Sequence, residues 1–241
     1  EQVLTHVRRW ILLRAEAHAE LVAADPAVSY SFLCALARQC FNTQFAFFVA
    51  NDEARRVNGL RKNLQAALKQ SSVDPRMIER SLALAALYGS LHDLAGWERF
   101  LDPALSQWSE PFQPIVREQV IDHRQEQDIA DRLTALTKIR DEVSQKVRRQ
   151  YEENPYPRWI TVQRPQAMTP VDLVRSLRPG EAVRGFSHPA AILVAGCGSG
   201  QHPIQMAMAC TDCEIFAVDL SRASLAYAAR MAERFGVTNI T

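Results

Sequence analysis

The sequence predicts two parts of different architecture, a mainly α-helical N-terminal domain at 1–150 and the first half, βαβα, of a doubly wound α/β domain at 190–241. Three observations predict this division. Residues 1–150 hold only three glycines and repeat their apolar residues at helical spacing. Six of the twelve prolines lie at 155–189, which indicates a linker at 151–189. An unbroken apolar run at 190–195 then precedes a cluster of glycines.

The first part is expected to be an antiparallel array of amphipathic helices. Their apolar faces are Val3, Val7, Trp10, Ile11 and Arg14; Phe32, Leu36, Cys40, Thr43 and Phe47; Leu60, Leu64 and Leu68; Ile78, Leu82 and Ala85; and Leu136, Ile139, Val143, Val147 and Tyr151 on a long final helix. Because proline removes a donor and restricts the residue before it, helix ends are expected at Asp25-Pro26, Ser72–Pro75, Asp102-Pro103 and Glu110–Pro114. No repeat of fixed length is clear enough to predict a regular solenoid.

The second part alternates short apolar runs with helical patterns. In order, the expected elements are a helix at Pro170–Leu177 ended by Arg178-Pro179-Gly180, a strand at Ala190–Ala195, a helix at Pro203–Cys210, a strand at Glu214–Val218, and a helix at Arg222–Phe235 closed by Gly236. The first strand is expected to be buried on both faces of a parallel sheet. Both ends of the chain look cut, and Val237–Thr241 reads as the opening of a further strand.

The balance of charges narrows the class of partner. Lys and Arg number 28 and Asp and Glu 27, and the charges of 1–150 and 151–241 sum to +1 and 0. Because neither part is strongly basic, nothing predicts binding to nucleic acid or to an anionic membrane. No apolar run approaches the length of a membrane span, and no signal peptide is evident. The five cysteines have no framework spacing, which favours reduced thiols in a cytoplasmic protein.

The residues that carry chemistry follow the first expected strand. Gly196, Gly198 and Gly200 form a G-x-G-x-G turn between a strand and a helix, around Cys197. Glycine permits the tight turn and a close approach of the backbone to a ligand, and the next helix directs its first amides at that ligand. The dinucleotide fingerprint needs a glycine at position 201, where this chain has Gln201.

An acidic residue ends the second expected strand, nineteen residues after Gly200. There Asp219 can accept hydrogen bonds from both ribose hydroxyls of a nucleoside cofactor. Leu220 would lie flat beside the adenine, and Ser221 is placed to cap the next helix.

Together the glycine turn and Asp219 resemble the class I S-adenosyl-L-methionine-dependent methyltransferases. The stretches Tyr151–Trp159 and Leu33–Phe41 also look like bacterial methyltransferases that carry a helical, tetratricopeptide-associated region before the catalytic domain. The resemblance implies a Rossmann-like domain that binds the cofactor through Gly196, Cys197, Gly198, Gly200, Asp219 and Leu220. It implies transfer of a methyl group to an acceptor that the sequence does not identify, and the analogy with recruitment by a helical region favours a protein or peptide.

The chain departs from the family's pattern at two places. The family commonly has an acidic residue where this chain has Ala195, and that residue helps to orient the methionine part of the cofactor. A complete domain of the family also has about seven strands. We therefore expect methyl transfer in the full-length protein. In this segment alone we expect weak cofactor binding or none, no methyl transfer, and self-association. No residue can be assigned a catalytic role.

Four other features are interpreted as structural and not functional. The Cys210-x-x-Cys213 pair has no second ligand pair, so we interpret it as core or surface thiols. We interpret His202 as a histidine at a helix start, Tyr156 and Trp159 as anchors of the linker, and Arg148-Arg149 as a solvated helix face. No metal site is predicted. A second hypothesis is that residues 1–150 form a helical interaction module that recruits a partner without catalysis.

Overall fold

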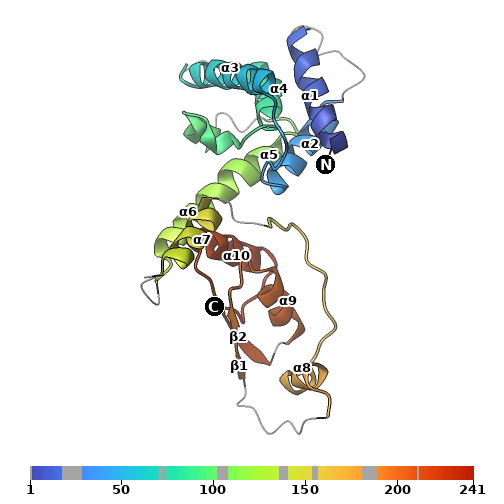
Figure 1. Ribbon diagram of the computed structural model, residues 1–241, viewed down its shortest axis with the longest axis vertical. Helices are drawn as coiled ribbons and strands as arrows, with labels where there is room; N and C mark the ends of the chain where they lie inside the picture. Colours follow the sequence, from blue (N-terminus) through green and yellow to red (C-terminus); the bar gives the residue numbers. More distant parts are fainter. Residues whose placement is uncertain are drawn as a thin grey trace. The chain divides into compact units, whose positions relative to one another are not determined.

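The computed structural model describes residues 2–17, 29–70, 73, 75–101, 108–135, 141–153, 157–180, 189–210 and 212–241. The chain is mainly helical, with one small parallel sheet, and it divides into two compact units at 1–124 and 125–241 (Figure 1). This division falls within helix α6, upstream of the linker that the sequence suggests. Among the described residues, no helix combines the length and the apolar character needed to cross a membrane.

The first unit is built from helices and short helical turns. They are α1 (Gln2–Ala17), α2 (Tyr30–Asn42), α3 (Asn51–Leu68), α4 (Pro75–Ala85), the 3-10 turns η1 (Leu91–Asp93) and η2 (Trp97–Leu101), α5 (Gln113–Val116), the π-helical turn η4 (Arg117–Ile121) and the start of α6 (Asp122–Arg132). Leu64, Leu68, Leu82 and Ala85 are buried, which confirms the predicted faces of α3 and α4.

The predicted face of α1 is confirmed at Ile11 and Val7, which lie in or against the core, and is wrong at Val3, Trp10 and Arg14, which are exposed. Val3 and Trp10 are 73% and 43% exposed, whereas Arg8 and Leu12 are each 1% exposed. Inside the core, Arg8 Nη2 lies 3.6 Å from the buried carboxylate oxygen Glu53 Oε1, and the Arg8 guanidinium carbon lies 4.4 Å from the centroid of the Tyr88 ring. A cation held over an aromatic ring is stabilised inside a core, so the helix turns a charged residue inward. A pattern of apolar residues alone does not reveal that choice.

The predicted face of α2 is also wrong at both ends. Phe32 is 48% exposed, while Leu33 is buried beside it. The helix stops at Asn42, because Gln44 and Phe45 adopt left-handed backbone angles with φ of 54° and 53°. Thr43 and Phe47 therefore lie outside the helix, although Phe47 still packs against the core.

The long helix predicted at the end of the first part is shorter where the structure describes it. Helix α7 spans Glu142–Glu153, and 133–135 lie outside any helix. Leu136 and Ile139 lie outside the described residues. Val143, Val147 and Tyr151 are 68%, 40% and 41% exposed, so the predicted apolar face of this helix is not a core face.

The second unit holds the βαβα segment. Its elements are the end of α6, α7, α8 (Pro170–Leu177), β1 (Ala190–Ala195), α9 (Gln201–Ala209), β2 (Cys213–Val218) and α10 (Arg222–Arg234). The helices and strands predicted after residue 169 are thus confirmed within two residues at each end. The strands are parallel and pair from Ala190 with Cys213 to Ala195 with Val218.

A third segment extends the sheet at its β2 edge. Ile240 forms a parallel bridge with Ile215, and the Thr241 N–H donates to the Ile215 carbonyl at 2.8 Å. This pairing agrees with the prediction that 237–241 opens a strand only at Ile240, which forms an isolated bridge and not a full strand. Across the sheet the order is β1, β2 and then the bridged residue Ile240.

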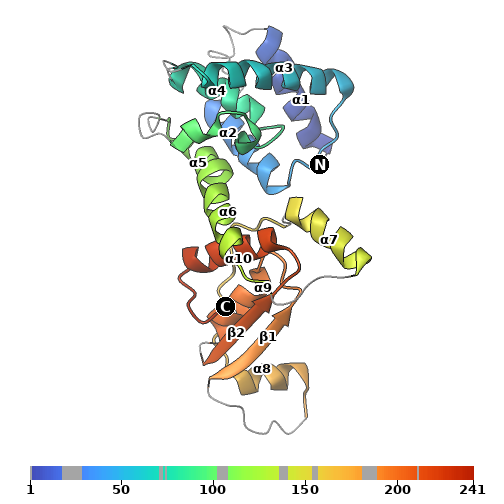
Figure 2. The same ribbon diagram turned by 90° about the vertical axis from the view of Figure 1, so that its left-hand side faces the viewer.

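Helices α9 and α10 cover one face of the strands (Figure 2). Ala207 of α9 packs with Ile215 of β2, and Ile204 of α9 packs with Met231 of α10. On the opposite face Leu193 is 67% and Phe216 is 37% exposed. The prediction that β1 is buried on both faces is therefore wrong for the described residues, because no described helix covers the second face.

Candidate functional site

The carboxyl ends of β1 and β2 bring most of the predicted site residues together. The Gly196 and Cys197 N–H groups donate to the Val218 carbonyl at 2.8 and 3.1 Å. The Gly198 N–H then donates to Asp219 Oδ2 at 2.8 Å. The acidic side chain is therefore fixed beside the glycine turn, as the spacing in the sequence predicts. Leu220 follows it and is 42% exposed.

Two of the three glycines face open space. Gly196 and Gly198 have left-handed φ angles of 69° and 55°. A Cβ added to either would meet no heavy atom within 4 Å in the part of the chain that the structure describes. The backbone at these two positions is open to close approach by a ligand.

Gly200 also has a packing role. It has a φ of 81°, and a Cβ added there would lie 2.4 Å from the Ala228 Cβ of α10. We expect Gly200→Ala to destabilise the protein by about 2–4 kcal/mol, because a left-handed backbone angle and overpacking add together. Gly198→Ala is the matched control and should cost only about 1–2 kcal/mol, since at that position only the left-handed backbone angle is unfavourable. Urea denaturation measures both.

The clash itself can be tested with a second change. Ala228→Gly removes the atom that a new Cβ at position 200 would meet. The double variant should therefore recover part of the stability lost by Gly200→Ala, and a double-mutant cycle measures the coupling. Equal losses for Gly198→Ala and Gly200→Ala, or no recovery in the double variant, would contradict the packing role.

The thiol inside the glycine turn stays protonated. Burial, and secondarily the negative charge of Asp219, raise the pKa of Cys197 to about 12. All five cysteines are free, and Cys210 and Cys213 are 1% and 2% exposed. These two thiols are core residues, which confirms their interpretation as core or surface thiols. Among the described residues, no cluster of three or more His, Cys, Asp or Glu side chains could hold a metal ion.

The proline-rich segment holds the glycine turn from outside. Trp159 Nε1–H donates to the Ser199 carbonyl at 2.9 Å, and the Ser199 hydroxyl donates to the Pro157 carbonyl at 2.7 Å. The Trp159 ring stacks on Phe235, with centroids 5.9 Å apart, and the Tyr227 hydroxyl donates to the Trp159 carbonyl. Trp159 is thus a buried anchor, as expected, whereas Tyr156 lies outside the described residues.

A buried ion-pair cluster fixes the same segment to helices α6 and α10. Glu126 is 7% exposed and lies between two guanidinium groups that are each 8% exposed. Glu126 Oε2 lies 3.1 Å from Arg158 Nη2, and Glu126 Oε1 lies 2.9 Å from Arg230 Nε. Both guanidinium carbons also lie 5.1 Å from the centroid of the Tyr227 ring. The sequence alone does not reveal this cluster, because its members are far apart in the chain.

A second residue that the sequence does not single out is Glu152 of α7, which contacts the start of α10. The Arg222 N–H donates to Glu152 Oε1 at 2.9 Å, and the Ala223 N–H donates to Glu152 Oε2 at 3.2 Å. Arg148, predicted to be only a solvated cation, places its Nε 3.3 Å from Glu152 Oε1. His202 is exposed at the start of α9, as expected for a histidine at a helix start.

No protein-family model, curated protein or solved structure matches this chain. The arrangement offers open backbone at two glycines, a carboxylate pinned beside them, and a helix, α9, that begins at Gln201 without a side-chain cap. Such a set can hold a polar group at the helix start and a pair of hydroxyls at the carboxylate.

Proposed function

We propose that the full-length protein binds S-adenosyl-L-methionine at the carboxyl ends of β1 and β2 and transfers its methyl group. The observation that carries the proposal is the hydrogen bond from the Gly198 N–H to Asp219 Oδ2. It holds the carboxylate at the mouth of the glycine turn. Each carboxylate oxygen has two lone pairs, so Asp219 can still accept one hydroxyl on each oxygen.

The order of the strands supports a Rossmann-like domain. Across the sheet, the spatial order β1, β2 and then Ile240 matches one half of a doubly wound fold. In open parallel sheets of this kind, ligands bind beyond the carboxyl ends of the strands. The glycine turn and Asp219 occupy that edge here.

Methyl transfer requires the protein mainly to position the cofactor and the acceptor. S-adenosyl-L-methionine supplies a methyl group activated on a sulfonium sulfur. Gly196 and Gly198 would allow the backbone to approach the methionine part, and Asp219 would orient the ribose. Methyl transfer is an in-line displacement, which depends mainly on positioning and on exclusion of water. We further propose that the methyl acceptor is a protein or peptide.

Calorimetric titration of the full-length protein with S-adenosylhomocysteine tests the proposal. We expect saturable binding with one ligand per chain, and competition by S-adenosylmethionine. ATP is the control ligand, because it shares the adenosine but carries a triphosphate. The absence of S-adenosylhomocysteine binding would overturn the proposal, and so would equal affinity for ATP.

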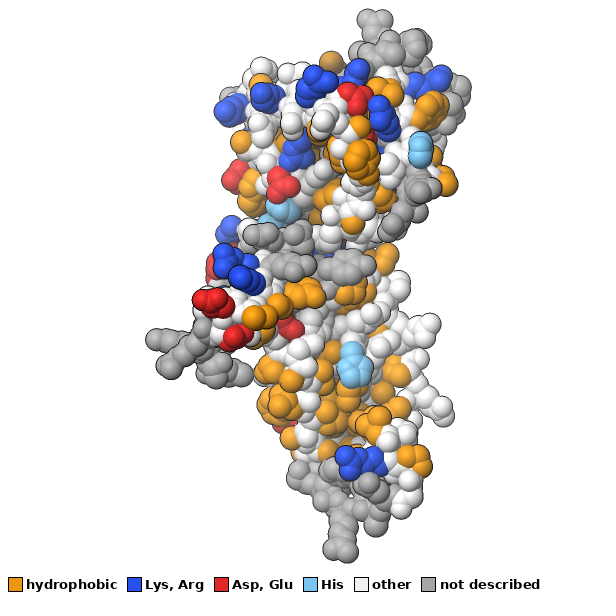
Figure 3. Space-filling view, in the orientation of Figure 1, with side chains coloured by type: hydrophobic (Ala, Val, Ile, Leu, Met, Phe, Trp, Pro, Cys, Tyr) orange, Lys and Arg blue, Asp and Glu red, His pale blue; other side chains and the backbone are white. Residues whose placement is uncertain are grey.

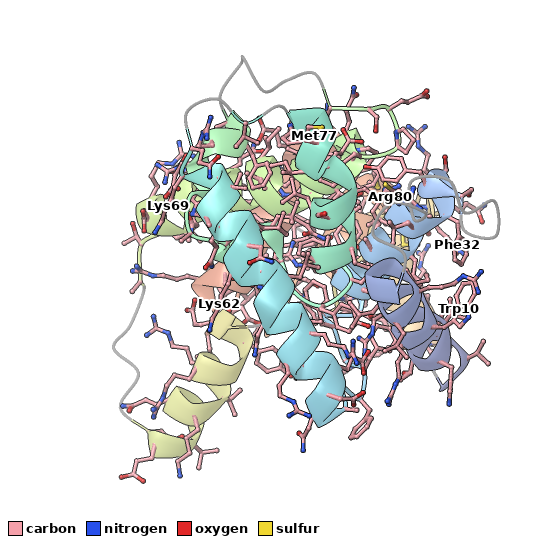
Figure 4. All side chains as sticks on the ribbon, turned by 90° about the horizontal axis from the view of Figure 1, so that it is seen from above. Trp10, Phe32, Lys62, Lys69, Met77 and Arg80 are labelled. Carbon is pink, nitrogen blue, oxygen red and sulfur yellow. The ribbon has the colours of Figure 1, made fainter. Side chains whose placement is uncertain are left out.

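A second candidate function, a helical interaction module for acidic peptides, is favoured by one surface. The exposed side of α3 carries Arg55, Lys62 and Lys69 at heptad spacing, with the small residues Gly59 and Ala66 between them. Lys and Arg gather over this helix in Figure 3, and Lys62 and Lys69 lie on the same side of α3 in Figure 4. The two acidic residues of α3 do not neutralise this surface, as Asp52 pairs with Arg9 at 3.0 Å and Glu53 is buried.

Charge reversal tests this second function. Changing Arg55, Lys62 and Lys69 together to Glu should abolish binding of a labelled oligo-glutamate peptide, measured by fluorescence anisotropy at low and high salt. The matched control reverses three exposed arginines elsewhere, Arg117, Arg164 and Arg175. Equal binding by both variants would exclude a specific role for this side of α3, and binding of single-stranded DNA in place of the peptide would reassign the surface.

A further inference from the structure

The N-terminus of α10 is fully closed by acceptors from the chain itself. The Ser221 N–H donates to Asp219 Oδ1 at 2.9 Å, and the Ser224 N–H donates to Ser221 Oγ at 3.1 Å. Between them, the Arg222 and Ala223 N–H groups donate to the two carboxylate oxygens of Glu152. The first amides of a helix have no intrahelical partner, and here two carboxylates and a hydroxyl take them all.

Glu152 reaches this position from a distant part of the chain. It lies on α7, 70 residues before Arg222. A carboxylate that accepts two consecutive amides at the positive end of a helix is well placed electrostatically. Arg148, one turn earlier on α7, supports the same oxygen at 3.3 Å. Glu152 belongs to the Tyr151–Trp159 stretch, which the proposed function alone leaves without a role beyond anchoring.

The closed terminus adjoins the proposed ribose site. Asp219 and Glu152 accept from neighbouring amides, those of Ser221 and Arg222. A phosphate on a ribose hydroxyl held by Asp219 would lie beside this terminus, where open helix amides would otherwise bind it. In this chain those amides are occupied, and a second negative charge would repel the phosphate.

We propose that Glu152 is the residue that restricts the site to an unphosphorylated ribose, and that it positions the turn that carries Asp219. This inference rests on the proposed binding of S-adenosylmethionine. Glu152 acts in two ways. It fills the amides that a ribose 2′-phosphate would need, and it ties α7 to the turn between β2 and α10 so that Asp219 keeps its orientation.

The test compares two probes in the full-length protein, adenosine and adenosine 2′-monophosphate, by calorimetry. In Glu152→Gln, the side-chain NH2 must face one of the two amide N–H groups, so one hydrogen bond is lost together with the charge. We expect the ratio of the two dissociation constants to shift toward the phosphate by about tenfold or more. Affinity for S-adenosylhomocysteine should fall severalfold, because the turn is less well fixed. Hydrogen exchange at the Arg222 and Ala223 amides should accelerate.

Two further variants make the test specific. Glu142→Gln, an exposed glutamate on the same helix, is the matched control and should leave both the ratio and the exchange rates unchanged. Glu152→Asp keeps the charge and should retain the discrimination against phosphate, which guards against a general failure of Glu152→Gln to fold. A residue that only capped the helix would lower the melting temperature without moving the ratio.

The outcomes separate this inference from the proposed function. If the wild-type protein binds S-adenosylhomocysteine and the ratio is the same in Glu152→Gln, the inference is overturned and the proposed function stands. If the wild-type protein does not bind S-adenosylhomocysteine, the proposed function fails first and the inference falls with it. A shifted ratio in Glu152→Gln that Glu152→Asp restores supports both.

Discussion

Asp219→Ala should weaken binding of S-adenosylmethionine to the full-length protein by roughly ten- to a hundredfold. The carboxylate is the proposed acceptor for the ribose hydroxyls, and a hydrogen bond to a charged group contributes about 1.5–3 kcal/mol. The same change removes the acceptor of the Gly198 and Ser221 N–H groups. The turn that presents the ligand loses its fixed shape as well, so both effects act in the same direction.

Calorimetry on a matched pair of variants checks this expectation. Glu214→Ala removes an exposed carboxylate from the opposite end of β2 and should leave the affinity unchanged. Asp219→Asn keeps one side-chain acceptor, so its affinity should lie between those of the wild type and Asp219→Ala. Unchanged affinity in Asp219→Ala would exclude the proposed role of this residue.

Glu126→Ala should destabilise the second unit by about 3–5 kcal/mol, because removing one member of a buried ion-pair network leaves the remaining charges uncompensated. Here two guanidinium groups, those of Arg158 and Arg230, would lose their shared carboxylate, and both are 8% exposed. A whole domain is stable by only about 5–15 kcal/mol. The variant should therefore be partly unfolded under mild denaturing conditions.

Urea denaturation followed by circular dichroism measures the effect. Asp131→Ala is the control, since Asp131 is an exposed acidic residue on the same helix as Glu126, and it should change stability by less than about 0.5 kcal/mol. Glu126→Gln keeps the shape of the side chain and removes the charge. If Glu126→Ala costs no more than Asp131→Ala, the cluster does not hold Arg158 and the proline-rich segment in place.

The elements of the second unit were predictable because their signals are local. An apolar run, a glycine cluster and a serine before a helical pattern each act within a few residues, and α8, β1, α9, β2 and α10 appear where those signals lie. The pairing of Asp219 with the glycine turn was predictable for a related reason. Parallel strands end at the same edge of a sheet, so two motifs that each follow a strand meet there.

Helix faces in the first unit were harder to predict. Arg8 is buried against the carboxylate of Glu53 and the ring of Tyr88, and Tyr88 lies 80 residues along the chain from Arg8. The helical period identified α1 as a helix and placed Ile11 inward, but it did not reveal that Arg8 shares this buried side. An apolar scale counts arginine as a surface residue, whereas a guanidinium over an aromatic ring can be buried.

The βαβα order, the glycine turn and the carboxylate at the end of β2 follow from the amino-acid sequence. The packing of Gly200 against Ala228, and the closing of the start of α10 by Glu152, become visible only in the folded chain. These two groups of features differ in the range of the interactions that produce them. Backbone propensity and strand direction are set by neighbouring residues, whereas an added Cβ meets an obstacle, or a carboxylate finds a free amide, only after distant segments have packed together.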